Sequence, residues 1–309
     1  MVSIEKESYA GFDCVRVSNE VISLWITKSI GPRIIGLSLK GGENLFALLP
    51  DAQYTHQNGD VYYFRGGHRL WVAPEEVSTT YYPDNQPVSV TQIENGIEVI
   101  QPEEDSTGLQ KSMKISLPDD DQAVVRIEHR IENLGTTTAA LAAWAISQLR
   151  PGGVGILPMN MELADEHGLL PNRQLALWPY TYPGHPLVSL GKRYLLVTAA
   201  FDDGPFKVGF PNPRGWLGYL LEGTLFVKQA KYDPQALYYD LNSSSECYCG
   251  PMFLELETLG PKTVLKPGEH LIHYETWRLY EDMEYDADED YVDGLLSKYP
   301  EIELAIQMD

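Results

Sequence analysis

Val21-Ile22-Ser23-Leu24-Trp25-Ile26 and Ile34-Ile35-Gly36-Leu37-Ser38-Leu39 are two short runs, rich in β-branched residues, that decide the fold class of this chain. Such runs predict β-strands. Turn residues follow them, as in Lys40-Gly41-Gly42, and recur later, as in Lys266-Pro267-Gly268. Many short strands joined by turns are typical of a sandwich or barrel and not of alternating strand and helix units. We therefore expect an all-β fold, built as a large antiparallel β-sandwich.

The rest of the chain extends this pattern. Further strands are expected at residues 123–128, 194–198, 253–257 and 273–277. Residues 50–87 and 150–190 hold much Pro, Gly, Tyr and Trp, and we expect them to be loop-like. Apolar residues at helical spacing, after an acidic start, predict a short C-terminal helix at about 287–300. The sequence shows no low-complexity linker, so we expect residues 1–309 to form a single domain.

Net charge limits the possible partners. The chain of 309 residues has 23 basic and 44 acidic side chains, a formal charge of −21. This charge repels phosphate backbones and anionic lipids, so we expect neither a nucleic acid nor a membrane partner. A small, uncharged ligand such as a sugar meets no such repulsion. The charge also has a simpler interpretation, which is solubility alone.

The cysteines and the N-terminus indicate the compartment. Cys14, Cys247 and Cys249 are too few, and odd in number, for a disulfide framework, and no zinc-finger spacing accompanies them. The first residues carry charge where a signal peptide needs an apolar run. We expect reduced cysteines and a cytoplasmic protein with no metal site.

One stretch concentrates groups suited to a carbohydrate. Residues 65–76 place His68, two arginines, Trp71 and two glutamates in a glycine-rich segment that we expect to be a loop. Polar groups of this kind make paired hydrogen bonds to neighbouring hydroxyls, and an aromatic face covers the apolar face of a sugar ring. In the alternative interpretation, His68 and Trp71 only pack against the protein.

A second candidate is the pair of glutamates at residues 255 and 257. Strand alternation places Glu255 and Glu257 on one face, so one carboxylate could be solvated and the other held in a cleft for proton transfer. The alternative is the outward polar face of an amphipathic strand. Arg33, before an apolar strand, and Lys228, within an apolar run, are further candidates for a cleft.

The order of these segments resembles a known superfamily. An early Gly-Pro-Arg-Ile-Ile-Gly-Leu strand, a Gly-Gly-His segment and a late Leu256-Glu257-Thr258 precede Leu265-Lys266-Pro267-Gly268-Glu269 and a strand that ends at Trp277. Across most of the chain this is similar to the galactose mutarotase-like (aldose 1-epimerase) superfamily, and to its bacterial members in particular. The resemblance implies a supersandwich of antiparallel strands with a sugar cleft on a concave face.

The resemblance also implies roles for single residues. Glu257 would be the base that takes the anomeric proton, and His68 would match the first histidine of the family. Arg33 and Asn44 lie where early cleft residues fall. Mutarotases carry a second histidine as the acid, whereas this chain has Leu141-Ala142-Ala143-Trp144-Ala145-Ile146-Ser147 at the comparable place. We therefore expect His68 to supply the proton in a pocket that also holds Glu257.

The leading hypothesis is thus an aldose 1-epimerase-like protein that acts on the anomeric centre of a sugar without a cofactor. The ligand is a small molecule or an oligosaccharide, and its predicted contacts are Arg33, Asn44, Arg69, Trp71, Glu75, Trp144, Lys228 and Glu255. One alternative is a non-catalytic carbohydrate-binding protein. Another is a glycoside hydrolase or lyase that uses paired carboxylates.

Overall fold

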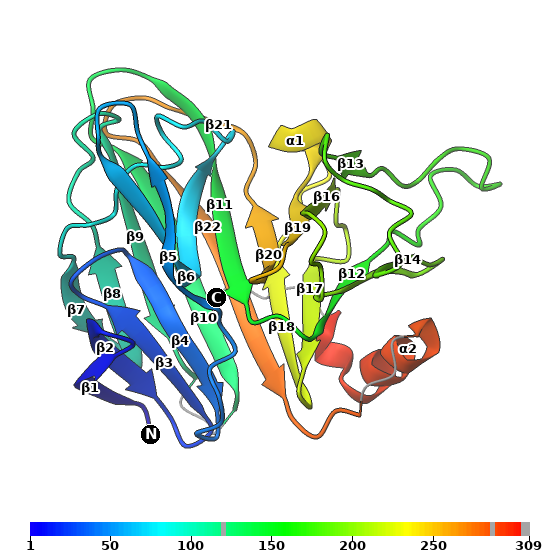
Figure 1. Cartoon of the computed structure of the whole chain (residues 1–309). Helices are drawn as coiled ribbons and strands as arrows, with labels where there is room; N and C mark the ends of the chain where they lie inside the picture. The colour runs from blue at the N-terminus through cyan, green and yellow to red at the C-terminus, as the bar shows by residue number, and fades with distance from the viewer. Residues whose placement is uncertain (119–121, 285–287, 304–309) are drawn as a thin grey trace.

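The computed structural model describes residues 1–118, 122–284 and 288–303. Over these residues the chain forms two large antiparallel sheets whose inner faces share one apolar core (Figure 1). The predicted all-β sandwich is therefore confirmed. The larger sheet positions the candidate site, and the smaller sheet covers its back.

The larger sheet has 12 strands. Along its main path the order is β1 (Ser3–Tyr9), β2 (Phe12–Ser18), β3 (Ile22–Thr27), β4 (Arg33–Leu39), β6 (Val61–Ala73), β11 (Ala139–Leu149), β20 (Leu254–Leu259), β19 (Ser245–Cys249), β16 (Phe206–Phe210) and β13 (Ala176–Leu177). Two strands lie off this path: β5 (Leu48–Thr55) pairs with β6, and β21 (Thr263–Leu265) pairs with β11.

The smaller sheet has 10 strands. Its order is β14 (Val188–Leu190), β15 (Tyr194–Thr198), β12 (Val154–Pro158), β17 (Trp216–Leu221), β18 (Thr224–Ala230), β22 (His270–Tyr280), β10 (Val124–Asn133), β9 (Leu109–Ser116), β8 (Gly96–Ile100) and β7 (Ser89–Ile93). Strands predicted around residues 21–26, 34–39, 194–198 and 273–277 appear as β3, β4, β15 and β22.

Helices are few and short among the described residues. The predicted C-terminal helix is α2 (Glu289–Lys298), and Asp288 caps it by accepting a hydrogen bond from the amide of Tyr291. A 3₁₀ turn, η1 (Pro300–Ile302), follows, and the expected start at 287 lies outside the described residues. Val292 and Leu295 pack α2 against the outer face of the smaller sheet, at the lower right of Figure 1. None of the described helices is long and apolar enough to cross a membrane.

The expectation of a loop over residues 50–87 is wrong for half of that region, because β5 and β6 occupy residues 50–55 and 61–73. Gly66 and Gly67 hide β6 from a pattern search, since glycine weakens a strand signal. Both have positive φ, 90° and 74°. A Cβ atom on Gly66 would lie 1.9 Å from the carbonyl oxygen of Ala47, and one on Gly67 would lie 2.2 Å from that of Ile34. The glycines therefore mark a close approach of neighbouring strands and not a loop.

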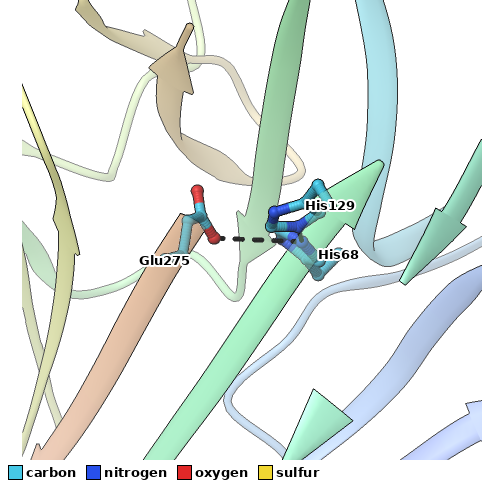
Figure 2. A group of neighbouring side chains, drawn as sticks. All are labelled: His68, His129 and Glu275. Carbon is cyan, nitrogen blue, oxygen red and sulfur yellow. Dashed lines mark hydrogen bonds and ion pairs between the residues drawn. The ribbon is translucent and has the colours of Figure 1, made fainter. Parts of the chain in front are cut away.

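A buried polar cluster crosses the core between the sheets. His68 of β6, His129 of β10 and Glu275 of β22 converge there, with the carboxylate of Glu275 pointing toward the two imidazoles (Figure 2). Lys228 lies 2.9 Å from a Glu275 oxygen, and both side chains are fully buried. Trp277 donates to the other Glu275 oxygen at 2.9 Å. The buried charges therefore balance as one ion pair.

Hydrogen bonds assign the tautomers of the two histidines. His129 Nδ1 lies 3.1 Å from the carbonyl oxygen of His273 and must donate to it, so His129 Nε2 is an acceptor. His68 Nε2 donates to that atom at 2.8 Å, and His68 Nδ1 then accepts from the hydroxyl of Ser147 at 2.9 Å. Both imidazoles are neutral and fully bonded in this arrangement.

The same three groups are capable of binding a metal, since their ligand atoms lie within 4.8 Å of one another. The neighbouring ammonium of Lys228 opposes such an ion, because a divalent cation here would leave excess positive charge in the core. The neutral hydrogen-bonded network accounts for the geometry better than a metal site does.

The cluster predicts a pH-dependent stability. Burial, aided by the charge of Lys228, lowers the pKa of His129 to about 3 and that of His68 well below its ordinary value. Burial also lowers the pKa of His273 to about 3. From pH 6.5 down to about 3 the unfolded chain binds protons that the folded chain excludes. The free energy of unfolding therefore decreases as the pH is lowered, by up to about 1.4 kcal/mol per pH unit for each histidine.

Urea unfolding at pH 7, 6 and 5 measures this slope. His273→Gln keeps a donor toward Thr258. It should reduce the pH dependence of the free energy of unfolding by about the contribution of one histidine. His270→Gln, at an exposed position of the same strand, is the control and should retain the wild-type slope. Equal slopes in all three proteins would contradict the assignment.

Candidate functional site

The outer face of the larger sheet carries rows of side chains across β6, β11, β20, β19 and β16. Strand pairing sets Arg69 opposite Ile146, and Ile146 opposite Glu257. Glu257 in turn lies opposite Glu246. Because paired residues point to the same side of a sheet, these side chains share one face. Glu255 lies two residues before Glu257 on β20, and alternate residues of a strand point to the same face. The predicted common face of Glu255 and Glu257 is therefore confirmed.

Above this face lies a cleft of about 510 Å³. Its walls combine aromatic rings with charged groups: Asp51, Ala52, Gln53, Phe64, Arg69, Trp71, Glu75, Tyr81, Trp144, Tyr180, Lys207, Tyr248, Gly250, Pro251, Met252, Phe253 and Glu255. Concave sites lined by aromatic groups and a few convergent polar groups are the usual form of a small-molecule site.

Arg69 presents free donors at the cleft floor. Its Nη2 donates to Glu255 Oε1 at 3.1 Å, and its guanidinium stacks 4.1 Å from the ring centre of Trp71. Nε and Nη1 are buried and have no hydrogen-bond partner among the described residues. Buried donors without partners are costly, so they indicate a site that a ligand completes.

Glu255 is the glutamate of this pair that lines the cleft. Burial and the negative charge of Glu257 raise the pKa of Glu255 to about 7, against the opposing effects of Arg69 and Lys207. A carboxyl group with a pKa near neutrality is suited to general acid–base chemistry.

Glu257 lies beneath the cleft and is fully buried. Its Oε2 accepts from Trp144 Nε1 at 2.7 Å and from Lys207 Nζ at 3.1 Å. Its Oε1 has no partner in the part of the chain that the structure describes. Trp144 and Lys207, which do line the cleft, therefore lie between Glu257 and a ligand.

Lys207 of β16 joins two glutamates. Besides Glu257, its Nζ lies 2.9 Å from Glu246 Oε2 and packs against the rings of Trp144 and Trp178, 4.6 and 4.7 Å from their centres. Burial opposes the charge of Lys207, but the negative charges of Glu246 and Glu257 outweigh it and raise the pKa of Lys207 well above its ordinary value.

The structure brings together half of the residues predicted for the site. Arg69, Trp71, Glu75, Trp144 and Glu255 line the cleft, where Glu75 accepts a hydrogen bond from Tyr81.

The other predicted site residues lie elsewhere. His68 and Lys228 belong to the interior cluster behind the sheet, because each is adjacent along its strand to residues that face the other way. The expected pocket shared by His68 and Glu257 is therefore not formed, and Lys228 does not reach the cleft. Arg33 is buried against Asp84 and backbone carbonyls of β6, and Asn44 bonds to backbone groups of Ile35, Leu37 and Phe46.

Sequence reasoning missed Lys207 and Glu246. Lys207 interrupts the apolar run Phe206–Phe210, the same signal that singled out Lys228. Glu246 lies next to Cys247, within a strand that is almost wholly buried. Neither signal tells which face of a sheet the side chain occupies, and only the register does.

Solved structures of other proteins share this fold. A galactose mutarotase-like protein from Lactobacillus casei ATCC 334 superimposes with a TM-score of 0.55, at 11% identity, over 86% of this chain and 100% of that protein. The Slr1438 protein from Synechocystis sp. PCC 6803 superimposes with a TM-score of 0.52 at 11% identity, over 92% of this chain and 99% of the Slr1438 chain. The predicted likeness to the galactose mutarotase-like superfamily is thus confirmed as a likeness of fold.

A longer protein also matches. A TPR-domain containing protein from Parabacteroides distasonis ATCC 8503 has a TM-score of 0.60 at 18% identity, over 89% of this chain. The chain spans 48% of that protein's length. No protein-family model matches the sequence, and no curated protein does. At these identities the comparisons establish the fold, and the chemistry must be argued from the cleft.

Lys207→Met tests the buried charges of the site. The variant leaves Glu246 and Glu257 without their cation, so we expect a loss of about 3–5 kcal/mol in the free energy of unfolding at pH 8. Adding Glu257→Gln to Lys207→Met should restore a large part of the lost free energy of unfolding. Lys28→Met removes a half-exposed ion pair with Asp13 and should cost at most about 1 kcal/mol. Urea unfolding of the four proteins gives the comparison, and a Lys207→Met protein as stable as wild type would contradict the assigned pairing.

Proposed function

We propose that this chain, which has the galactose mutarotase-like fold, binds a carbohydrate in the cleft and transfers protons at its anomeric centre. The observation that carries the proposal is the set of unpartnered buried atoms on the cleft face. Arg69, which lines the cleft, has no hydrogen-bond partner for Nε and Nη1 among the described residues, and Gln148, on the same sheet face beneath the cleft, has none for either polar atom of its side chain. A polyhydroxyl ligand supplies both donors and acceptors to such a set.

The aromatic walls support a sugar in particular. Trp71, Tyr81, Tyr180 and Tyr248 line the same cleft as the polar floor. A pyranose has one face of C–H groups and an edge of hydroxyls, so rings cover the first while Arg69 and Glu255 bind the second. The ligand is accordingly a monosaccharide or the end of an oligosaccharide.

Glu255 is the base in this proposal. The resemblance in sequence assigns that role to Glu257, but Glu257 is fully buried beneath Trp144 and Lys207. Glu255 is two residues away on the same face, lines the cleft and is hydrogen-bonded to Arg69. Glu257 instead orients the Lys207 and Trp144 side chains that contact the ligand.

The first experiment is a thermal-shift screen against neutral, amino, acidic and phosphorylated sugars, followed by polarimetry on the freshly dissolved α-anomer of any binder. A ligand that binds only the folded state raises the unfolding temperature. Trp71→Ala should weaken binding at least tenfold, since it removes a ring face from the cleft wall.

A sugar that binds without faster mutarotation supports the alternative of a non-catalytic carbohydrate-binding protein. Release of a free sugar from a glycoside supports the hydrolase alternative.

Glu255→Gln should lower kcat by about 10²- to 10⁴-fold with little change in KM. The variant keeps the shape of the side chain and its contact with Arg69 but cannot accept a proton. In the wild type, activity should rise with pH through about 7, because the base works only when ionised and burial, together with the charge of Glu257, raises its pKa to about 7. Glu98→Gln, on β8 of the other sheet, is the control. An unchanged rate in Glu255→Gln would move the base elsewhere.

A further inference from the structure

The proposed reaction needs an acid for the ring oxygen as well as a base. The interior position of His68 removes the group that the sequence offered for that role. Among the described groups that line the cleft, Lys207 is placed differently from Arg69: it lies on the cleft wall and is also in contact with the two buried glutamates beneath it. This placement makes Lys207 a link between a ligand and the buried carboxyl groups.

Charge balance in the site requires one carboxyl group to hold a proton. Two cations, Arg69 and Lys207, face three buried glutamates, Glu246, Glu255 and Glu257. A third negative charge would be uncompensated in a buried site, which costs several kcal/mol. One of the three is therefore neutral in the resting protein.

Glu246 is the group best suited to hold that proton. Burial raises the pKa of Glu246 well above its usual range, despite the nearby charge of Lys207. Its Oε2 lies 2.9 Å from Lys207 Nζ, whereas its Oε1 has no hydrogen-bond partner among the described residues. The nearby negative charge of Asp240, like that of Glu257, adds to this rise in the pKa of Glu246. Burial also raises the pKa of Asp240, which is the less buried of the two.

Lys207 is held in its charged form, which decides the kind of chemistry it can do. A lysine nucleophile must be a neutral amine, as when it is buried without a carboxylate. Here two glutamates lie at 2.9 and 3.1 Å, and Trp144 and Trp178 add ring faces that attract a cation. Lys207 is therefore a proton donor and not a nucleophile.

We propose that Lys207 is the catalytic acid of this site and that Glu246 is the positioning residue that resupplies its proton. The inference rests on the proposed anomeric chemistry and assigns the acid that protonates the ring oxygen. In the forward step Glu255 takes the proton of the anomeric hydroxyl, and the O1–H electron pair forms the C1=O1 bond. The C1–O5 bond breaks, and O5 takes a proton from Lys207 Nζ. Glu246 then protonates the Lys207 amine.

The step balances and needs no cofactor. Before it, Arg69 and Lys207 are cations and Glu255 and Glu257 are anions; afterwards Glu255 is neutral and Glu246 is the anion. The site therefore keeps the same net charge throughout. Rotation about C1–C2 in the open-chain aldehyde, followed by the reverse transfers, closes the ring as the other anomer. The proton on O5 returns through Lys207 to Glu246, and that on Glu255 returns to O1.

The test compares wild type with Glu246→Gln, Glu246→Asp and Lys207→Arg, using freshly dissolved α-D-glucose, α-D-galactose and α-D-xylose in polarimetry. Glu246→Gln keeps the size of the side chain but cannot release a proton, so kcat should fall about 10²- to 10⁴-fold with KM within threefold. Glu246→Asp should recover part of the rate. Lys207→Arg keeps the charge toward both glutamates but does not donate at neutral pH, and should fall as far as Glu246→Gln. Lys6→Gln on the edge strand β1 is the control.

Two further measurements keep a folding defect apart from a catalytic one. Urea unfolding and calorimetric sugar binding show whether each variant is folded and binds. Carboxyl ¹³C shifts of glutamate, assigned with Glu246→Gln, should show Glu246 protonated at pH 7 whatever the activity.

The outcomes separate the two proposals. Folded, binding variants with a lowered kcat, together with a protonated Glu246, support the assignment. A wild type that catalyses while both Glu246→Gln and Lys207→Arg stay within threefold overturns the acid role and leaves the proposed function intact. A wild type that accelerates the mutarotation of no sugar that it binds overturns both.

Discussion

The site depends on two layers of buried charge that lie on opposite sides of the larger sheet. The ion pair of Lys228 and Glu275, from the smaller sheet, faces its core side, and the ion pairs of Arg69 and Lys207 lie on its cleft side. Lys228 donates from the core side to the carbonyl oxygens of Ala145 and Leu256. These residues immediately precede Ile146 and Glu257, whose side chains face the cleft. The interior ammonium thus holds the backbone of the cleft floor from behind. Rigid support of this kind is what a site needs to keep its polar groups in place.

The fold was predictable because the relevant signals are local. Turn residues and β-branched runs mark β3, β4 and β15, and each strand signal needs only its own residues. β6 was misread as a loop because Gly66 and Gly67 look like turn residues. Their real role is to let neighbouring backbones come closer than a Cβ atom would permit. That requirement comes from Ala47 and Ile34, which are distant in sequence, so no local pattern contains it.

The site was only half predictable for a related reason. Alternation places Glu255 with Glu257, and proximity in sequence joins Arg69 to Trp71, so these groups could be found. Alternation also separates His68 from Arg69, but the sequence does not say which of the two faces the cleft. Lys207 could have been singled out by the same signal as Lys228, yet one belongs to the cleft and the other to the core. Strand register, which is a long-range property, makes that distinction.

Burial favours a lysine over a histidine as the acid that we propose for this site. Imidazoles buried in this protein lose their protons, as the pKa of about 3 for His129 illustrates. A histidine enclosed to the same degree beneath Trp144 would be neutral at physiological pH and would give up a proton only through its high-pKa N–H group. An amine starts from a much higher pKa, and the negative charge of Glu257 raises the pKa of Lys207 further. The same glutamate would make Lys207 a weak acid if it worked alone. A neighbouring neutral carboxyl group removes that difficulty, because it returns a proton to the amine and leaves the buried charge unchanged. Lysine and Glu246 are therefore interdependent in this site.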